Sequence, residues 1–369
     1  MDTNISKIPI REHSRSRIVG LDILRILLAV LIYMFHSWMH IGCSYSYLDD
    51  FVSVGAIAMT GFFMLSGYAL RLVYGDKDIL SKRDIGRFYV KRLLSIIPLY
   101  YFCALLYVLI CDKGSVMEKI FLFPIEALGL QTTLVSLSDY THNSGTWFIS
   151  CILLAYLIYP FLQAICKMLA KNKKIIVLLI LMAIDIYGAI ASHKFDTSWT
   201  YENPFYRIVE FTCGLLIADI NMEYDGKLLK IIRSRVLFFC SVIVLLTGVS
   251  LIRHNLHFDD YMLYNVIVLP CFTIMLFALG TIKMPLLERS KAISYCSKLS
   301  YVFFLVQLFM RKVVKWELYY IGYDSNILRI LLSFSYCIIA SVLIYELVQK
   351  PITLYVNKIL YKNNSIAER

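Results

Sequence analysis

The stretch 22-DILRILLAVLIYMFHSWMH-40 has the length and hydropathy of a helix that crosses a lipid bilayer. It nevertheless contains one acidic, one basic and two titratable imidazole side chains, which are Asp22, Arg25, His36 and His40. A charged side chain at depth in a bilayer is costly unless it faces a partner or a cavity. These residues are therefore candidates either for pairing inside the protein or for function.

The rest of the chain has the composition of a membrane protein. Of its 369 residues, 59% are hydrophobic and 17% are charged, whereas about a quarter of a soluble domain is charged. Ten apolar windows approach the length of about 20 residues that a spanning helix needs. The windows lie near 18–40, 51–73, 94–112, 147–165, 175–192, 205–220, 236–252, 262–281, 299–315 and 326–348. The sequence predicts an all-α polytopic membrane protein with about ten transmembrane helices.

The basic residues predict the orientation, because cytoplasmic loops are rich in Lys and Arg. With the N-terminus inside, the inner segments contain 27 Lys and Arg residues and the outer segments contain 7. This places a cytoplasmic segment at 1–17, the membrane domain at 18–348 and a short cytoplasmic tail at 349–369. The net charge of +11 then reflects orientation and attraction to anionic membrane lipids. Because the basic residues are spread over all inner loops, we expect no nucleic-acid partner.

Arg25 and His36 share one face of the first predicted helix. Eleven residues at 100° each leave a difference of about 20°, and a rise of 1.5 Å per residue separates the two positions by about 16.5 Å along the axis. One face of the helix thus carries a cation in the cytoplasmic half of the membrane and an imidazole nearer the outer side. We expect both side chains to face one interior passage. In an alternative interpretation, Arg25 pairs with Asp22 three residues earlier or extends to the interface. His36 and His40 have metal-ligand spacing but no third ligand, so no metal is expected.

Several segments resemble, in order, the landmarks of the integral-membrane acyltransferase family 3, which includes O-acetyltransferases of bacterial surface polysaccharides. The first is the Arg-x10-His pair in LDILRILLAVLIYMFHSW. The others are GFFMLSGYAL (61–70), RFYVKRLLSIIPLYYF (87–102), NSGTWFISCILLAYLIYPFL (143–162), NPFYRIVEFTCGLLIA (203–218), SKLSYVFFLVQ (297–307) and YELVQKP (345–351). The chain departs from the family pattern at Ser95, Gln307 and Gln349, where Arg, His and Glu are common.

The resemblance implies a multi-pass acyltransferase of the inner (plasma) membrane. Its donor would be a cytoplasmic acyl-CoA, most commonly acetyl-CoA, and no cofactor would be permanently bound. The acceptor would be a hydroxyl of a cell-surface carbohydrate or of a polyprenyl-linked glycan. From composition alone, a transporter or flippase for a lipid-linked sugar or small anion is the alternative, although the paired halves and broken helices of many transporters are not evident.

The candidate site residues follow from this chemistry. A sugar hydroxyl needs a base, and histidine has an ordinary pKa near 6.5, which suits that task. His36 is therefore the predicted base, with a covalent acyl-histidine as the rival route. Arg25 would hold the pantetheine or phosphate portion of the donor, or polarise the thioester oxygen.

The remaining candidates would contact the two substrates. Arg92 and Lys91, in the basic segment 71–92, would bind the phosphates of coenzyme A, although the positive-inside rule explains most of that segment. Ser66 would contact the donor, or its Ser-Gly pair would simply let two helices pack closely. Trp147 and Gln307 are the predicted acceptor-binding residues, with an interfacial role as the alternative for Trp147.

Overall fold

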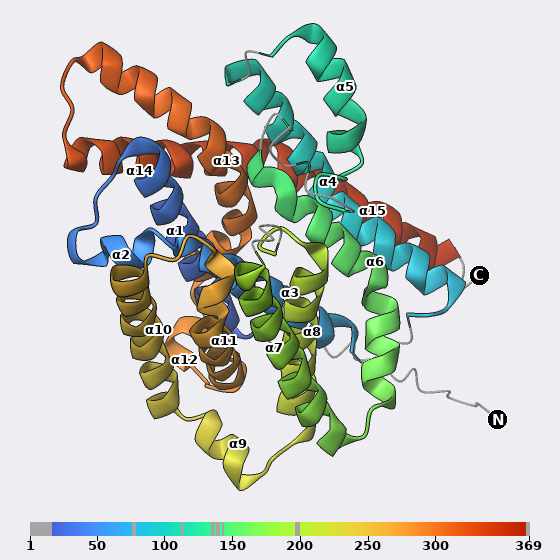
Figure 1. Cartoon of the computed structure of the whole chain (residues 1–369). Coiled ribbons are helices and arrows are strands. Elements are labelled where there is room, and N and C mark those ends of the chain that lie inside the picture. The colour runs from blue at the N-terminus through green and yellow to red at the C-terminus, as the bar shows by residue number, and fades with distance from the viewer. Residues whose placement is uncertain are drawn as a thin grey trace.

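The structure is a computed structural model of the whole chain. It describes residues 17–75, 79–111, 114–133, 137, 141, 144–195 and 200–366, so the predicted segment 1–17 lies outside the described residues except for Arg17. The described residues are helical, with turns and short loops but no strand (Figure 1). The α-helices are α1 (Val19–Ile41), α2 (Asp49–Val52), α3 (Ala58–Tyr74), α4 (Lys82–Ile110), α5 (Val116–Ala127), α6 (Trp147–Met168), α7 (Lys171–Lys194), α8 (Pro204–Glu223), α9 (Lys227–Ile232), α10 (Arg235–Leu256), α11 (Asn265–Leu279), α12 (Pro285–Glu288), α13 (Lys291–Ile321), α14 (Asn326–Ile344) and α15 (Lys350–Ile366).

Nine helical stretches of the described chain are long and apolar enough to cross a membrane. They comprise α1, α3 with the short turn before it, α4, α6, α7, α10, α11 with the short turn before it, α13, and α14 continued into α15. The predicted all-α polytopic membrane protein is therefore confirmed. The side of the membrane on which each terminus lies stays a prediction.

The sixth predicted span, 205–220, coincides with α8, which is not among these nine stretches. Every side chain from Val209 to Ile220 is buried, including Glu210 and Asp219. The helix lies inside the bundle and packs against α3, α6 and α7 (Figure 1). A helix that is covered by protein on all sides need not be apolar, so its composition falls short of that of a lipid-facing span.

Two glycines bring α3 and α8 into close contact. A Cβ atom added at Gly67 would lie 1.9 Å from the carbonyl oxygen of Phe211, and one at Gly214 would lie 1.8 Å from the carbonyl oxygen of Met64. Only residues without a Cβ atom allow the two backbones to approach this closely. The Ser-Gly pair of the second predicted span therefore serves helix packing through its glycine.

A buried polar network joins α8 to three neighbouring helices. The Arg207 guanidinium donates to both carboxylate oxygens of Glu210 at 2.8 Å, and both side chains are fully buried. Thr60 of α3 donates to Glu210 at 2.8 Å. Asn265 of α11 donates to Asp185 of α7 at 2.7 Å and to Glu210 at 3.3 Å. A charged pair is tolerated here because hydrogen bonds satisfy most of its polar atoms.

A second ionic cluster lies at the C-terminal end of α3. Asp219 of α8 pairs with Arg71 of α3 and, at 3.1 Å, with Lys174 of α7. Lys174 also reaches Glu223 at 2.7 Å. Two cations thus face two carboxylates where α3, α7 and α8 meet, and the charges in this cluster balance.

Three regions differ from the predicted element boundaries. The third span begins at Lys82 rather than near residue 94, so the second half of the basic segment 71–92 forms the first turns of α4. The connecting segment 113–146 contains α5, which has no buried residue. The last span continues through a π-helical turn, Tyr345–Gln349, into α15. These ends depend on helix caps and tertiary packing, which hydropathy windows do not detect.

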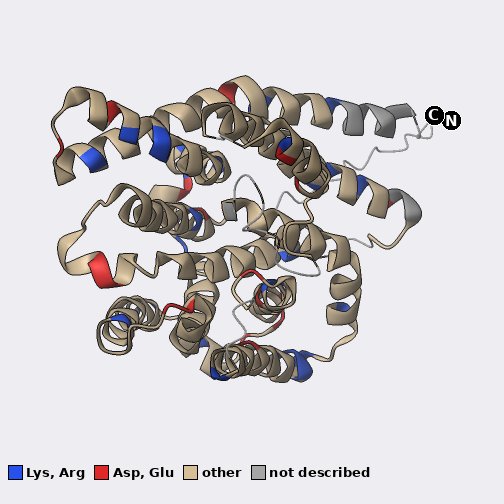
Figure 2. Cartoon of the chain, turned by 45° about the horizontal axis from the view of Figure 1, so that its top comes forward, with Lys and Arg blue, Asp and Glu red and all other residues tan. Residues whose placement is uncertain are grey.

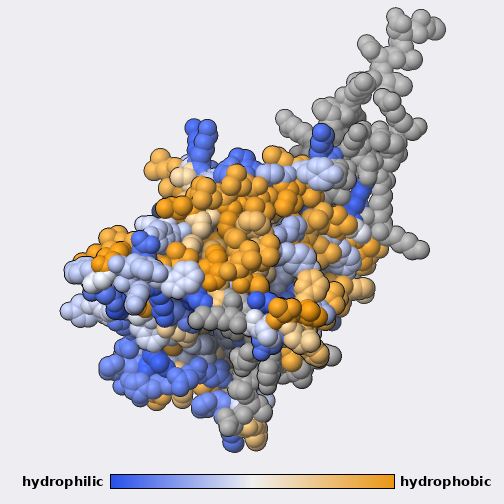
Figure 3. All heavy atoms as spheres, turned by 90° about the horizontal axis from the view of Figure 1, so that it is seen from above, coloured by the Kyte–Doolittle hydropathy of each residue, from blue (hydrophilic) through white to orange (hydrophobic). Residues whose placement is uncertain are grey.

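The surface agrees with a protein that lies in a bilayer. Charged residues are sparse along the helices in Figure 2, where most of the ribbon is uncharged. The face seen in Figure 3 carries a broad hydrophobic area, and hydrophilic side chains gather towards its margins. Large side chains such as Leu109, Leu157 and Leu251 are more than half exposed, as expected where lipid replaces water.

Candidate active site

The first helix packs against α13, and the two run in the same direction. Near the start of both helices, Ser297 of α13 accepts a hydrogen bond from Arg25 Nη1 at 3.2 Å and donates one to Asp22 Oδ1 at 2.6 Å. Farther along both helices, Gln307 of α13 reaches the carbonyl oxygen of Ala29 at 3.5 Å. We call this contact between the two helices the α1–α13 seam. It puts the predicted catalytic face of α1 against protein rather than lipid.

Arg25 has donor capacity that its neighbours do not use. Its guanidinium lies 3.8 Å from Asp22 Oδ1, so the predicted intrahelical pair forms, but loosely. The bond to Ser297 uses one nitrogen, and the other two make no hydrogen bond to any residue that the structure describes. The side chain is 34% exposed. A half-exposed guanidinium with free N–H groups can bind an anionic or carbonyl ligand.

His36 lines a small pocket between α1, α13 and α14. Its Nδ1 atom is buried and has no hydrogen-bond partner among the described residues. Gln307 lines the same pocket, and its Oε1 atom is likewise buried without a partner. Buried polar atoms are nearly always hydrogen-bonded in folded proteins. Two buried polar atoms without a partner among the described residues make this pocket a candidate site for a polar ligand.

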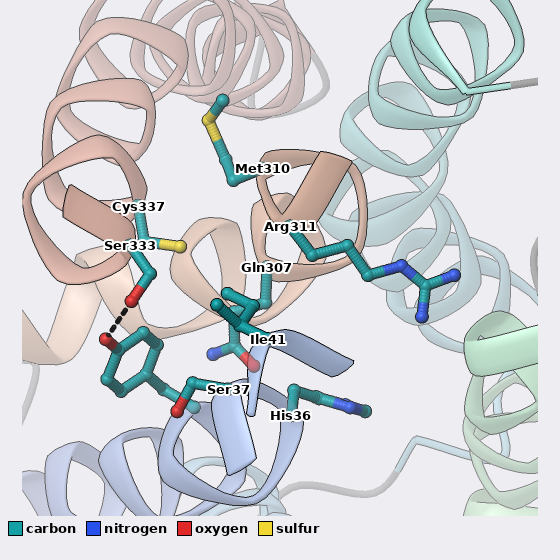
Figure 4. A pocket seen from close by; sticks show the side chains of 9 residues that line it. His36, Ser37, Ile41, Gln307, Met310, Arg311, Ser333 and Cys337 are labelled. Atoms are coloured by element: carbon teal, nitrogen blue, oxygen red, sulfur yellow. Dashed lines mark hydrogen bonds between the residues drawn. The ribbon is translucent and has the colours of Figure 1, made fainter. Parts of the chain in front are cut away.

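Figure 4 shows how the side chains of this pocket are arranged. His36 of α1 and Arg311 of α13 extend towards the same side, and Gln307 lies between the two helices. On the other side, the dashed line marks the 2.6 Å bond between the Tyr33 hydroxyl and Ser333 of α14, which closes the wall. The His36 ring thus extends from α1 to the side of the pocket opposite that bond.

The predicted metal-ligand spacing of His36 and His40 leads to stacking. The two rings are nearly parallel, at 11°, with centroids 5.5 Å apart. In the described part of the chain, no group of three or more His, Cys, Asp or Glu side chains is arranged to hold a metal ion.

The pocket of His36 does not include Arg25. The structure therefore brings the two predicted catalytic residues to one helix–helix seam, as the spacing predicts, but His36 lines this pocket and Arg25 does not. Their axial separation of about 16.5 Å exceeds the reach of an arginine side chain. If both residues take part in one reaction, they contact different parts of the substrate.

Arg92 of α4 sits in an aromatic box. Its guanidinium carbon lies 5.2 Å from the ring centre of Tyr74 and 5.9 Å from those of Phe88 and Tyr156. Nη2 donates to the Tyr74 hydroxyl at 3.1 Å, and the buried Nε has no partner among the described residues. Tyr156 of α6 also lies close enough to Arg25 to interact with it electrostatically. Arg25 and Arg92 therefore converge on Tyr156, a residue that was not predicted as part of the site.

The other two predicted donor-binding residues lie nearby in sequence but differ in their surroundings. Lys91 precedes Arg92 on α4 and is half-buried. The Ser66 hydroxyl of α3 donates to the carbonyl oxygen of Phe62, one turn earlier, at 2.7 Å. That bond satisfies the hydroxyl within its own helix, so the structure gives Ser66 no open donor. Their predicted roles towards a donor stay predictions.

Trp147, at the start of α6, lies away from the His36 pocket. It is 6% exposed, and Arg207 lies over its ring at 5.4 Å. Phe63 and Tyr201 complete the box around the same guanidinium at 5.7 and 4.7 Å. The structure thus separates the two predicted acceptor-binding residues, because Gln307 lines the pocket and Trp147 covers a buried cation.

Comparison with known protein families identifies the class to which this protein belongs. Residues 18–346 match the family model described as an acyltransferase domain. Because this match covers most of the chain, the protein belongs to that family, the integral-membrane acyltransferase family 3. It is a multi-pass membrane acyltransferase. No curated protein matches the chain, and no solved structure does so.

Proposed function

We propose that the protein transfers an acyl group, most simply acetyl, from cytoplasmic acyl-CoA to a hydroxyl of a cell-surface or polyprenyl-linked carbohydrate. The membrane would be the inner (plasma) membrane. The observation that carries the proposal is the α1–α13 seam, which presents Arg25 at one level and His36, with an unpartnered ring nitrogen, at another. No permanently bound cofactor is needed for this chemistry.

The 16.5 Å separation assigns the roles. If His36 acts where the acyl group is transferred, Arg25 cannot also polarise the thioester oxygen, because it is about three helical turns away. Arg25 and Arg92 would instead hold the pantetheine arm or the phosphates of coenzyme A, with Tyr156 between them. An extended pantetheine arm is long enough to bridge from that level to His36.

The chemical step follows from these positions. The unprotonated nitrogen of His36 takes the proton of the acceptor hydroxyl while the hydroxyl oxygen attacks the carbonyl carbon of the thioester. The carbon–sulfur bond breaks, and coenzyme A leaves as the thiolate, which takes up a proton. The side-chain oxygen of Gln307, which is buried without a partner among the described residues and lines the same pocket, can accept a hydrogen bond from the acceptor sugar. That bond would orient the sugar. An acyl-histidine intermediate would use the same nitrogen as a nucleophile.

The direct test uses purified protein and acetyl-CoA labelled in the acetyl group. We expect release of free coenzyme A and transfer of label to a glycan fraction from the same membranes. His36→Ala should slow both at least about a hundredfold. His254→Ala, which removes an exposed histidine paired with Asp50, should leave both unchanged. Glycan movement across liposomes without any donor would instead favour a flippase and reject the proposal.

A further inference from the structure

The outer part of the α1–α13 seam, as oriented above, carries a series of polar side chains on one face of α13. Gln307, Arg311 and Lys315 are spaced by four residues, so they rise along one side of the helix. Arg311 lines the His36 pocket, and its charge acts on both His36 and His40. The charge of Lys315 acts on His40. One cation therefore lies beside the proposed reaction centre, and a second lies one helical turn farther along α13.

Neither cation is neutralised by the protein. Within the described chain, Arg311 makes only a 3.5 Å contact with the Tyr107 hydroxyl, and Lys315 is exposed and forms no ion pair. Lys312 differs, because its ammonium group turns towards α4 and bonds the carbonyl oxygen of Cys111. Basic residues are otherwise rare in the predicted outer segments. The orientation rule, which explains Lys and Arg on the cytoplasmic side, gives no reason for this pair.

We propose that Arg311 and Lys315 bind an anionic group of the acceptor, a phosphate or a carboxylate, while the reacting hydroxyl lies at His36. This inference rests on the proposed function and deepens it by naming the acceptor class. A guanidinium on a helix can form two parallel hydrogen bonds to either kind of anion, and the lysine adds a point charge. Both sit at the end of the seam opposite the donor residues, so they serve a different substrate.

The spacing restricts the acceptor further. Arg311 lines the same pocket as His36, and Lys315 is about 6 Å, one helical turn, farther along α13. The anionic group should therefore lie on the acylated sugar or on the unit next to it. A sugar attached to a lipid phosphate satisfies this limit, and so does a glycan that contains a uronic acid.

The test is a binding measurement on the full chain in neutral detergent at low ionic strength, with paired probes that differ in charge. Farnesyl phosphate against farnesol represents a lipid-linked acceptor, and methyl glucuronide against methyl glucoside represents an anionic glycan. We expect the protein to bind at least one anionic probe about tenfold or more tightly than its neutral partner. The pair that shows the preference identifies the source of the anion.

Variants connect the preference to the proposed residues. The double substitution Arg311→Gln with Lys315→Gln should remove the preference, whereas Lys312→Gln, which removes one positive charge at the same helix end, should retain it. The proposal is overturned if the wild type shows no anionic preference, if the double variant keeps it, or if Lys312→Gln loses it equally. Coenzyme A release from acetyl-CoA is measured in parallel, so a failure of the transferase proposal is seen separately.

Discussion

Replacing Gly67 by alanine tests the packing that positions the buried helix. The new Cβ atom would lie 1.9 Å from the carbonyl oxygen of Phe211, whereas ordinary contact begins at 3.4 Å, so the two backbones must separate by about 1.5 Å. No side-chain rotation can relieve a clash with backbone. Overpacking a protein interior lowers the free energy of unfolding by about 1–3 kcal/mol, occasionally more. We expect Gly67→Ala to lie at the upper end of this range, because the clash is with backbone. A loss of about 3 kcal/mol lowers the ratio of folded to unfolded protein roughly a hundredfold.

The assay is thermal unfolding of the purified protein in detergent, followed by intrinsic fluorescence. Gly86→Ala is the matched control, because Gly86 lies within α4, is exposed, and would have nothing within 4 Å of its new Cβ atom. Alanine favours a helix over glycine by about 1 kcal/mol, so the control should unfold at the wild-type temperature or above. If Gly67→Ala and Gly86→Ala unfold at the same temperature, the close contact between α3 and α8 is wrong.

Three further predictions concern the buried charges and the proposed reaction. His36→Ala should lower the rate of coenzyme A release about 10²- to 10⁴-fold, the usual contribution of a general base, and leave the unfolding temperature unchanged. A variant that turns over at the wild-type rate would exclude His36 both as the base and as the nucleophile. Arg25→Gln should raise KM for acetyl-CoA about tenfold and leave the unfolding temperature unchanged. If the substitution weakens only acceptor binding, Arg25 does not bind the donor. Glu210→Gln should lower the free energy of unfolding by about 3–5 kcal/mol, because Arg207 is left as an unpaired buried charge. Asp185→Asn keeps the oxygen that accepts a hydrogen bond from Asn265, so it should be tolerated. Equal unfolding temperatures for the two variants would refute this reasoning.

The hydropathy pattern and the helical period predicted much of this fold. They identified the spanning segments and the shared face of Arg25 and His36, because both properties are local to one helix. They also allowed a pair between Arg25 and Asp22, which forms at 3.8 Å. The sequence of motifs predicted the family, which the match over residues 18–346 confirms.

Other features could not be derived from one sequence, because they depend on which helices meet. The packing of α13 against the predicted catalytic face of α1 joins residues about 270 positions apart, and no local period encodes it. Arg311 was visible only as a basic residue on the predicted outer side. Its position beside His36 follows from the parallel packing of the two helices. Similarly, Trp147 could be read as a membrane-interface residue, but the cation that it covers belongs to α8.

The polar character of α8 has a consequence for how the protein is made. A segment with a carboxylate such as Asp219 cannot partition into lipid on its own at low cost. Its counter-charges, Arg71 and Lys174, belong to helices that the ribosome synthesises earlier. Those partners are available when α8 emerges, so we expect it to enter the bilayer as a unit with α7, directly against α3. A chain rearranged so that α8 precedes them would have to bring Asp219 to the membrane before either counter-charge is present.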